Sequence, residues 1–106
     1  MIDILQVTTT VSSSEEAERI GHTLVEERLA ACAQIVGPVA SHYWWEGRVE
    51  QAVEWYCHLK TTSERYAALE LRLRALHSYA VPEIIAVPIS RGGSDYAAWI
   101  ADMVKS

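Results

Sequence analysis

The segment from residue 41 to residue 60 restricts the fold more than any other part of the chain. Apolar and polar residues alternate after Glu46-Gly47, a dipeptide suited to a two-residue turn because glycine readily adopts positive φ. The pattern predicts a long β-hairpin in which Trp44 faces Val49. A solvated strand has little use for three tryptophans, so we expect another copy of the chain to cover them. The aromatic residues expected in that interface are Tyr43, Trp44, Trp45 and Trp55.

Length and charge bound the remaining possibilities. The 106 residues suffice for one domain, residues 1–106, with one core. The formal net charge of -5 argues against nucleic acid as a partner, because phosphate binding requires clustered lysine and arginine. No apolar run approaches the ~20 residues of a membrane span, so no membrane partner is expected. The N-terminal stretch lacks the basic start of a secretory signal, which favours a cytoplasmic protein.

The two cysteines are expected to be free thiols. Cys32 begins the first hairpin strand and Cys57 lies near the end of the second. Pairing across the turn places Cys57 opposite Val36, four positions and about 13 Å from Cys32 at ~3.3 Å per residue. A disulfide requires Cα atoms within about 7 Å of each other. Two free thiols are usual in a reducing compartment.

The first half of the chain contains the pattern of a strand, a helix and a second strand. Residues 2–8 predict the first strand. A helix follows, with Ser13 and Glu16, or the pair one residue earlier, as a capping box. Residues 30–36 predict a strand that continues into the hairpin past a bulge or bend at Gly37-Pro38, because proline cannot donate to the sheet.

The second half predicts two more helices and one more strand. A helix is predicted to begin at Thr61, and residues 83–89 form a continuous apolar strand of the kind that is central or covered on both faces. A last helix capped by Ser94 follows, and its inward face is predicted to carry Tyr96, Trp99, Ile100 and Met103. The order strand, helix, strand, strand, helix, strand is the α+β, ferredoxin-like arrangement. Right-handed crossovers put both main helices on one face of the sheet, and the bare second face again predicts an oligomer.

Short motifs along nearly the whole chain occur together in a specific combination. They are Leu29-Ala30-Ala31-Cys32, Tyr43-Trp44-Trp45-Glu46-Gly47, Glu54, Lys60-Thr61, His77, Tyr79, Val81-Pro82-Glu83 and Tyr96-x-x-Trp99. In this combination the chain resembles the CutA1 divalent-cation-tolerance proteins. The resemblance implies a ferredoxin-like homotrimer similar to the PII signalling proteins, with long hairpins that clasp neighbouring subunits. It also implies an association with copper and other divalent metals.

Candidate metal ligands are scattered along the chain. No Cys-x-x-Cys, His-x-x-x-His or Cys-x-His motif is present, so a site for copper or another divalent cation requires ligands that a subunit interface brings together. The best set is Cys32 and His77, with Glu54 as a third ligand. The structural alternatives are a buried, apolar thiol for Cys32 and a residue favoured by the helix dipole for His77. His42 and His58 are candidate surface ligands for adventitious metal.

Lys60, Glu54 and Tyr79 form a second candidate set, which is predicted to line an inter-subunit cleft. A lysine beside a tyrosine and a carboxylate could act as an acid–base catalyst. An inter-subunit salt bridge with a tyrosine hydrogen bond is the favoured interpretation. No nucleophile motif or cofactor fingerprint accompanies these residues, so we expect no enzyme and no organic cofactor. Residues 91–94 precede a helix and could bind phosphate, but they lack a Walker lysine and are expected to form a plain turn.

The leading hypothesis is therefore a homotrimeric metal-binding protein of metal homeostasis, with copper as the favoured ion. The first alternative is a PII-like signalling or scaffold trimer that binds a small ligand or a partner protein in the subunit clefts. The second is an enzyme that uses Lys60, Glu54 and Tyr79.

Overall fold

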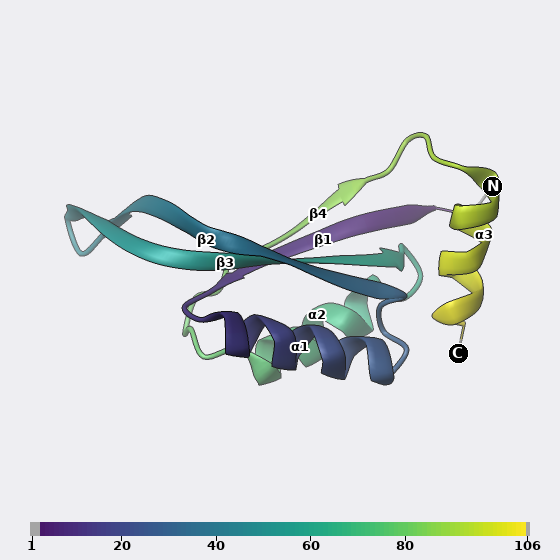
Figure 1. Ribbon diagram of the computed structural model, residues 1–106, viewed down its shortest axis with the longest axis horizontal. Coiled ribbons are helices and arrows are strands. Elements are labelled where there is room, and N and C mark those ends of the chain that lie inside the picture. Colours follow the sequence, from purple (N-terminus) through teal and green to yellow (C-terminus); the bar gives the residue numbers. More distant parts are fainter. Residues whose placement is uncertain (1–2, 106) are drawn as a thin grey trace.

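The computed structural model describes residues 3–105 and consists of a four-stranded antiparallel sheet with helices on one face and at one end (Figure 1). The elements are β1 (Ile4–Val11), α1 (Ser14–Glu26), β2 (Cys32–Trp45), β3 (Arg48–Thr62), α2 (Tyr66–Leu76), β4 (Ile84–Pro88) and α3 (Ser94–Met103). The strand order β2-β3-β1-β4 confirms the predicted α+β fold and agrees with the ferredoxin-like arrangement. The start of the first predicted strand, at residue 2, lies outside the described residues.

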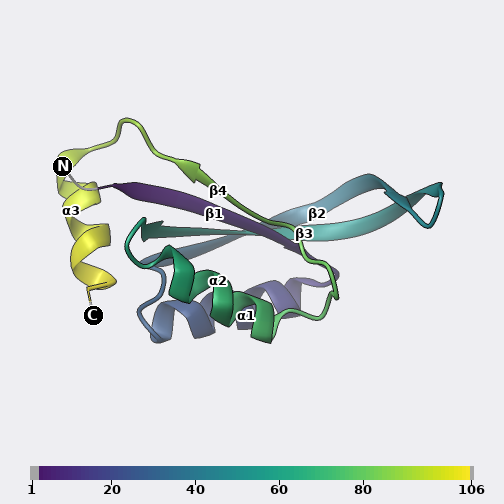
Figure 2. The same ribbon diagram turned by 180° about the vertical axis from the view of Figure 1, so that it is seen from behind.

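The β2–β3 hairpin projects well beyond the helices that cover the rest of the sheet (Figures 1 and 2). Its turn residues Glu46 and Gly47 have φ values of 50° and 81°, and positive φ at both positions is what a type I′ turn requires. Trp44 pairs with Val49, as predicted. The outer half of the hairpin therefore carries its aromatic side chains away from the core.

An irregularity in β2 occurs where the sequence predicted one. The register between β2 and β3 shifts between Val36 and Val39, and the intervening Gly37–Pro38 peptide is cis. The indole of Trp55 lies over Gly37 and packs against the chain's own core. Trp55 is thus partly covered within one chain, and its place in an interface between copies stays a prediction.

The register shift also changes where the cysteines lie. Cys57 pairs with Ile35 rather than with the predicted Val36, and Cys32 pairs with Lys60. Both cysteines are free, as predicted. Cys57 is fully buried beneath α1, and burial raises the pKa of its thiol to about 11.

The main core lies between the sheet and the helices α1 and α2. Apolar side chains of α1 recur three or four residues apart and meet the inward side chains of β1 and β3. The buried members are Val7, Val11, Ala17, Ile20, Leu24, Leu29, Ala30, Cys57, Leu59, Leu69 and Leu73. The opposite face of the sheet has no helix over it (Figures 1 and 2).

Helix α3 packs against the end of the sheet through a second, smaller cluster. Ile100 and Val104 are its buried residues, whereas Tyr96 and Trp99 remain 44% and 41% exposed and stack on each other. The predicted inward face is therefore confirmed for Ile100 and Met103, which pack on this cluster, and wrong for Tyr96 and Trp99. The apolar surface against which α3 packs is small, and it is covered by Ile100 and Val104, which are four residues apart and lie on the same side of the helix.

The start of α1 is tied to the segment that follows α2. The Ser13 hydroxyl accepts a hydrogen bond from the Glu16 backbone N–H at 3.1 Å, as a helix cap should. The second half of the predicted capping box is absent, because the Glu16 carboxylate instead accepts bonds from the backbone N–H and hydroxyl of Ser78 at 3.1 and 3.0 Å. Glu16 is consequently buried, and its carboxylate holds Ser78, the residue directly before Tyr79.

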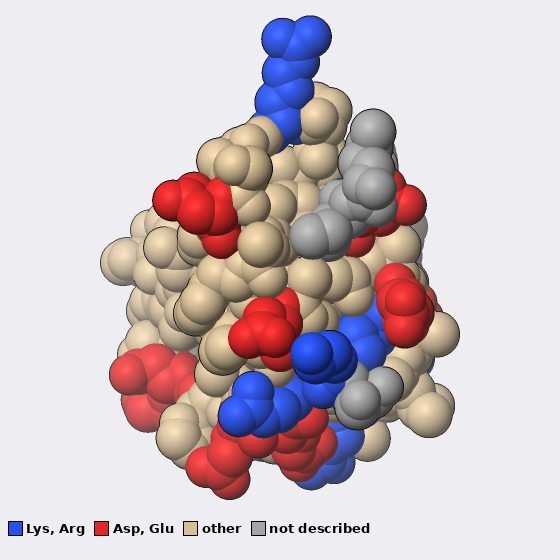
Figure 3. Space-filling model, turned by 90° about the vertical axis from the view of Figure 1, so that its right-hand side faces the viewer, with Lys and Arg blue, Asp and Glu red and all other residues tan. Residues whose placement is uncertain are grey.

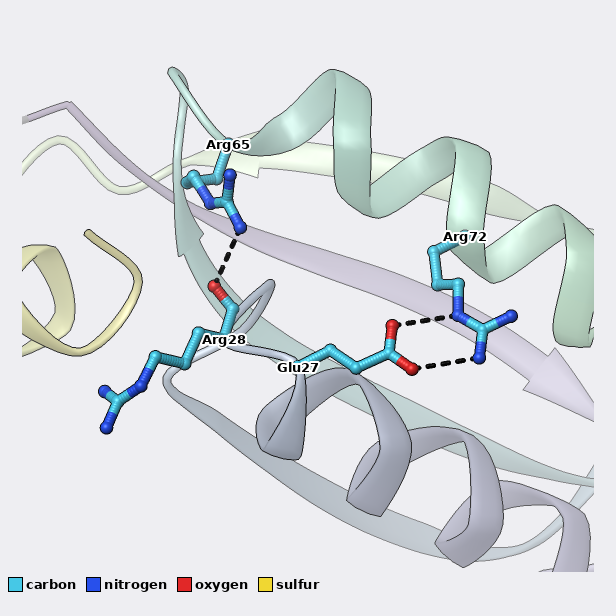
Figure 4. A network of polar contacts seen from close by, with 4 residues as sticks. All are labelled: Glu27, Arg28, Arg65 and Arg72. Carbon is cyan, nitrogen blue, oxygen red and sulfur yellow. Dashed lines mark hydrogen bonds and ion pairs between the residues drawn. The ribbon is translucent and has the colours of Figure 1, made fainter. Parts of the chain in front are cut away.

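Charged contacts fix the connection between α1 and β2 (Figure 4). The Arg72 guanidinium of α2 donates two hydrogen bonds of 2.9 Å to the Glu27 carboxylate. Arg65 donates to the backbone carbonyl of Arg28, and the Arg28 side chain donates to the carbonyl of Met103. Arg28 itself has a positive φ of 59°. The exposed ion pair orients these segments and adds little to stability.

Two predicted boundaries were wrong. Helix α2 begins at Tyr66 rather than at Thr61, because β3 continues through Thr62. The buried Thr61 hydroxyl donates to the Leu29 carbonyl at 2.8 Å, so this β-branched residue is held in the strand. Likewise α3 is capped by Gly93, with no side-chain cap bond from Ser94.

Strand β4 was predicted to be central or covered on both faces, and this was also wrong. It lies at the edge of the sheet and pairs only with β1. Ile85 and Val87 are 51% and 54% exposed on the helix-free face. An apolar run cannot by itself distinguish burial within a chain from burial between chains.

The molecular surface carries charges of both signs. Figure 3 views the end that bears α3, where acidic and basic side chains are interspersed over the lower, helix-bearing part. The upper part has more uncharged surface, but it also carries acidic side chains and a basic side chain that projects at the top. No extended basic patch occurs on the face in view. None of the helices within residues 3–105 has both the length and the apolar character needed to cross a membrane.

Candidate functional site

A cleft of about 960 Å³ separates the outer half of the hairpin from the segment between α2 and β4. The hairpin contributes aromatic side chains, and the segment contributes Tyr79 and residues 80–83. Two carboxylates, Glu54 from β3 and Glu83 from the segment, line the same space. The cleft is therefore an aromatic pocket with an acidic lining.

Glu54 and Tyr79 are in direct contact on one side of this cleft. The Tyr79 hydroxyl donates a 2.8 Å hydrogen bond to Glu54 Oε2, and Glu54 is only 8% exposed. Burial, then the hydrogen bond and charge of Glu54, raise the pKa of Tyr79. Tyr79 thus keeps its proton at neutral pH and acts as a hydrogen-bond donor.

His77 uses both ring nitrogens inside the chain. Nδ1 accepts the backbone N–H of Tyr79 at 3.1 Å, and Nε2 lies 3.0 Å from both the Thr10 carbonyl and the Thr9 hydroxyl. A carbonyl only accepts, so Nε2 carries the hydrogen. Binding a metal through either nitrogen would displace one of these hydrogen bonds.

Cys32 lies at the other end of the sheet. Its sulfur is 3.5 Å from the Tyr96 hydroxyl, and this hydrogen bond, followed by burial, raises the pKa of Tyr96. Cys32 pairs with Lys60, which is six positions along β3 from Glu54, or about 20 Å at ~3.3 Å per residue. One chain therefore does not bring Cys32 to His77 and Glu54. Among residues 3–105, no three His, Cys, Asp or Glu side chains gather as a metal-binding group.

Lys60 is likewise separate from the Glu54–Tyr79 pair. Its ammonium group donates a 3.0 Å hydrogen bond to Gln34 Oε1 on the helix-free face of the sheet. The predicted set of Lys60, Glu54 and Tyr79 is thus divided within one chain, and an inter-subunit cleft that reunites it stays a prediction.

His58, predicted as a surface ligand, lies partly buried at the middle of the helix-free face. Its Nδ1 is 2.9 Å from the Thr8 hydroxyl and 3.5 Å from the Gln6 amide nitrogen, and its ring stacks on Tyr56. Burial lowers the pKa of His58, and the charge of Lys60 lowers it further, against the opposing effect of Glu83. The imidazole is therefore mainly neutral at pH 7. Strand alternation indicated its face but not these partners.

Glu83 is the residue of the cleft that sequence reasoning missed. Its Oε1 lies 3.5 Å from the Thr10 hydroxyl, which places the carboxylate over β1. The sequence separation of Glu54 and Glu83 does not indicate that they line one cleft, because their segments come together only in the folded protein. Proline at position 82, which holds the preceding residue extended, was the one local signal.

Comparison with known proteins identifies the family. The family described as CutA1 divalent ion tolerance protein matches residues 5–103. The Divalent-cation tolerance protein CutA of Archaeoglobus fulgidus is 45% identical over 96 residues, which are 91% of this chain and 93% of the relative. A crystal structure of CutA from Xylella fastidiosa has a TM-score of 0.94 at 37% identity and covers 97% of this chain and 99% of that chain. A structure from Archaeoglobus fulgidus, described as a periplasmic divalent cation tolerance protein, has a TM-score of 0.93 at 42% identity, with 96% and 99% covered. With this match along nearly its whole length, the chain belongs to the CutA1 divalent ion tolerance family.

Proposed function

We propose that this protein is a homotrimeric metal-binding protein that contributes to divalent cation tolerance, with copper as the favoured ion. Membership of a family named for divalent ion tolerance, over residues 5–103, is the observation that carries the proposal. That name refers to tolerance of cations and not to a reaction, and we propose no catalytic turnover.

Exposed aromatic surface on the hairpin supports the trimer. Trp44 and Trp45 are 74% and 52% exposed in a single chain, and Val49 and Val53 add apolar surface beside them. Large exposed apolar surfaces mark interaction sites, and closed symmetry is the usual arrangement of identical chains. Ile85 and Val87 on the helix-free face supply a second surface for the same assembly.

The proposed metal site combines Cys32 of one copy with His77 and Glu54 of another. A thiolate, an imidazole and a carboxylate are a donor set suited to copper or zinc. The ligands fit unequally: Cys32 has only a weak contact to Tyr96 at 3.5 Å, whereas His77 must give up a hydrogen bond at Nδ1 or Nε2 to bind. Cys32 is thus the ligand on which the proposal depends most.

Calorimetry with Cu(I), Cu(II) and Zn(II) on reduced protein tests this function. We expect Cys32→Ala to abolish tight copper binding and His77→Ala to weaken it. Cys57→Ala is the matched control, because Cys57 is fully buried and should bind no metal in the folded state. Unchanged micromolar binding in both Cys32→Ala and His77→Ala would remove the proposed site.

A PII-like signalling or scaffold role is the second candidate, and the 960 Å³ cleft is the observation that favours it. A thermal-shift screen against nucleotides and metabolites separates it from metal binding, since a ligand of the cleft should stabilise Cys32→Ala and the unmodified protein equally. The enzyme alternative has less support, because Lys60 bonds to Gln34 and not to Glu54 or Tyr79.

We also propose a cytoplasmic location. Cys32 and Cys57 are both free thiols, which are typical of reducing compartments. The competing location is the periplasm, because the similar structure from Archaeoglobus fulgidus is described as that of a periplasmic protein. Cell fractionation followed by detection of the native protein distinguishes the two.

A further inference from the structure

We propose that copies of this chain associate head to tail, with Tyr96 and Trp99 of one copy inserted into the cleft of the next. That cleft, of about 960 Å³, lies between the hairpin and residues 78–83. Docking of this kind rests on the self-association proposed above and specifies which two surfaces meet. It follows from where these surfaces lie, from the aromatic side chains on both and from their charges.

The two surfaces lie far apart on one chain. The longest axis of the molecule spans 44 Å, and the hairpin that forms one wall of the cleft projects at one end of it, whereas α3 lies at the other end (Figures 1 and 2). These surfaces can therefore meet only between copies. A contact between two different surfaces of identical chains is heterologous, and repeated contacts of that type close into a ring when the rotation between copies allows it.

Tyr96 and Trp99 form a preformed aromatic pair on α3. Their rings are stacked with centroids 5.7 Å apart, although the two residues remain 44% and 41% exposed. The Tyr96 hydroxyl lies 3.5 Å from the sulfur of Cys32, and Asp95 Oδ1 accepts the backbone N–H of Tyr96 at 2.8 Å. Each ring can bury about 150–250 Å² against a partner, and aromatic residues are enriched in protein interfaces.

The cleft offers apolar walls that suit such rings. Its aromatic and aliphatic lining residues are Tyr43, Trp44, Trp45, Val81 and Pro82. Trp44 and Val81 are 74% and 78% exposed in a single chain, so both still have surface to bury. Aromatic rings in offset or edge-to-face contact stabilise each other beyond the area that they bury. A cleft of this volume has room for two rings.

Charge favours this pairing over contact of the cleft with its own copy. Glu54 and Glu83 line the cleft, and among the described residues no lysine or arginine does. Two clefts face to face would bring four carboxylates together, which is unfavourable. The α3 end instead supplies an ammonium group, because Lys60 pairs with Cys32, the residue that Tyr96 contacts.

Light scattering on the reduced protein tests the docking. Tyr96→Ser combined with Trp99→Ser should lower the mass from three chains to one, since loss of two aromatic anchors weakens association about thirtyfold or more. Tyr96→Phe keeps the ring and should keep three chains. Leu71→Ser is the matched control, because it removes a side chain that is 75% exposed on α2, away from both surfaces. Circular dichroism shows whether each variant folds.

A mixture of two defective variants tests the head-to-tail arrangement. Trp44→Ser with Trp45→Ser damages the cleft and leaves α3 intact, whereas Tyr96→Ser with Trp99→Ser does the reverse. One intact cleft then meets one intact α3, so the mixture should form a complex of two chains while each variant alone stays single. A mixture that gains no mass would overturn the arrangement.

Photo-cross-linking decides the matter even if the serine variants do not fold. Trp99→p-benzoylphenylalanine keeps an aromatic side chain and, in a mixture of isotopically light and heavy chains, should cross-link to residues 43–45 or 79–83 of another chain. Cross-links to α3 of another chain would overturn the docking. Three chains in the unmodified protein and in the variant that lacks both Tyr96 and Trp99 would overturn it while leaving the trimer. A single chain in the unmodified protein would overturn both, and copper calorimetry reports metal binding separately.

Discussion

The indole of Trp55 lies directly over the backbone of Gly37, on the neighbouring strand of the hairpin. A Cβ atom placed on Gly37 would approach Cγ and Nε1 of this ring to 2.7 and 2.9 Å, closer than Cβ atoms come to other heavy atoms in proteins. Glycine is needed here because its missing side chain makes room for the ring. The packing of Trp55 against the core depends on this contact.

Gly37→Ala should therefore destabilise the protein by about 1–3 kcal/mol, since the indole or the strand must move. Urea unfolding followed by circular dichroism measures the change. Gly92→Ala is the control, because the nearest atom to a Cβ there is 3.9 Å away, and its effect should stay within about 0.5 kcal/mol. Equal stability of the two variants would show that Trp55 adapts freely.

Tyr79→Phe should destabilise the folded chain by about 1–3 kcal/mol, because it leaves the buried Glu54 carboxylate without its donor. Thermal and chemical unfolding at neutral pH measure the loss. Tyr56→Phe serves as the control, since the Tyr56 hydroxyl makes no hydrogen bond within residues 3–105. A double variant with Glu54→Gln should lose less than the sum of the single losses. Additive losses would contradict a direct coupling of Glu54 and Tyr79.

Cys57 should make stability fall at alkaline pH. Burial raises its thiol pKa from the ordinary 9.0 to about 11, so between these values the unfolded chain has lost a proton that the folded chain retains. Fewer protons bound in the unfolded state mean that the free energy of unfolding decreases as pH rises, by an amount of the order of 2 kcal/mol across this window. Below pH 9 the contribution is fully present.

Denaturant titrations across this pH window test the effect as a difference between the unmodified protein and Cys57→Ala. The variant should show a shallower loss of stability as the pH rises through this window. In native protein at pH 8, Cys57 should also react much more slowly with iodoacetamide than after unfolding, because only the thiolate attacks. Rapid labelling of Cys57 in folded protein would argue against a buried thiol.

Replacing Trp44 and Trp45 together by serine should dissociate the proposed trimer, because these largely exposed rings are its expected contacts. Light scattering should then report the mass of one chain in place of three. Leu71→Ser removes a side chain of similar exposure, 75%, from α2 and should leave the assembly intact. Dissociation by Leu71→Ser as well would place the interface elsewhere.

Local patterns predicted the hairpin well because its determinants are local. Alternation and the Glu46-Gly47 turn fix the register, and Trp44 pairs with Val49 as expected. The same patterns failed at β4, where apolar residues lie at an open edge. They also failed at Thr61, where a long-range hydrogen bond to the Leu29 carbonyl keeps the strand extended. Helix propensity carries no information about such a distant partner.

The candidate site shows the same limit. Glu54 and Tyr79, 25 residues apart, were grouped and are hydrogen-bonded in the structure. Lys60 was grouped with them because it shares a strand face with Glu54, but a shared face does not make residues six positions apart neighbours. The engagement of His77 Nε2 could not be predicted either, since it depends on Thr9 and Thr10, which precede His77 by 68 and 67 residues.

Strands β2 and β4 each leave one row of backbone N–H and C=O groups without a strand neighbour in the described chain. A nascent polypeptide displays both rows as soon as its sheet forms, and any extended peptide can join them through main-chain hydrogen bonds. In the proposed trimer, pairing with sister molecules at these borders would compete with adventitious pairing with unrelated polypeptides. Under that proposal, the yield of usable protein would depend on how quickly sister molecules meet as well as on the stability of one folded molecule.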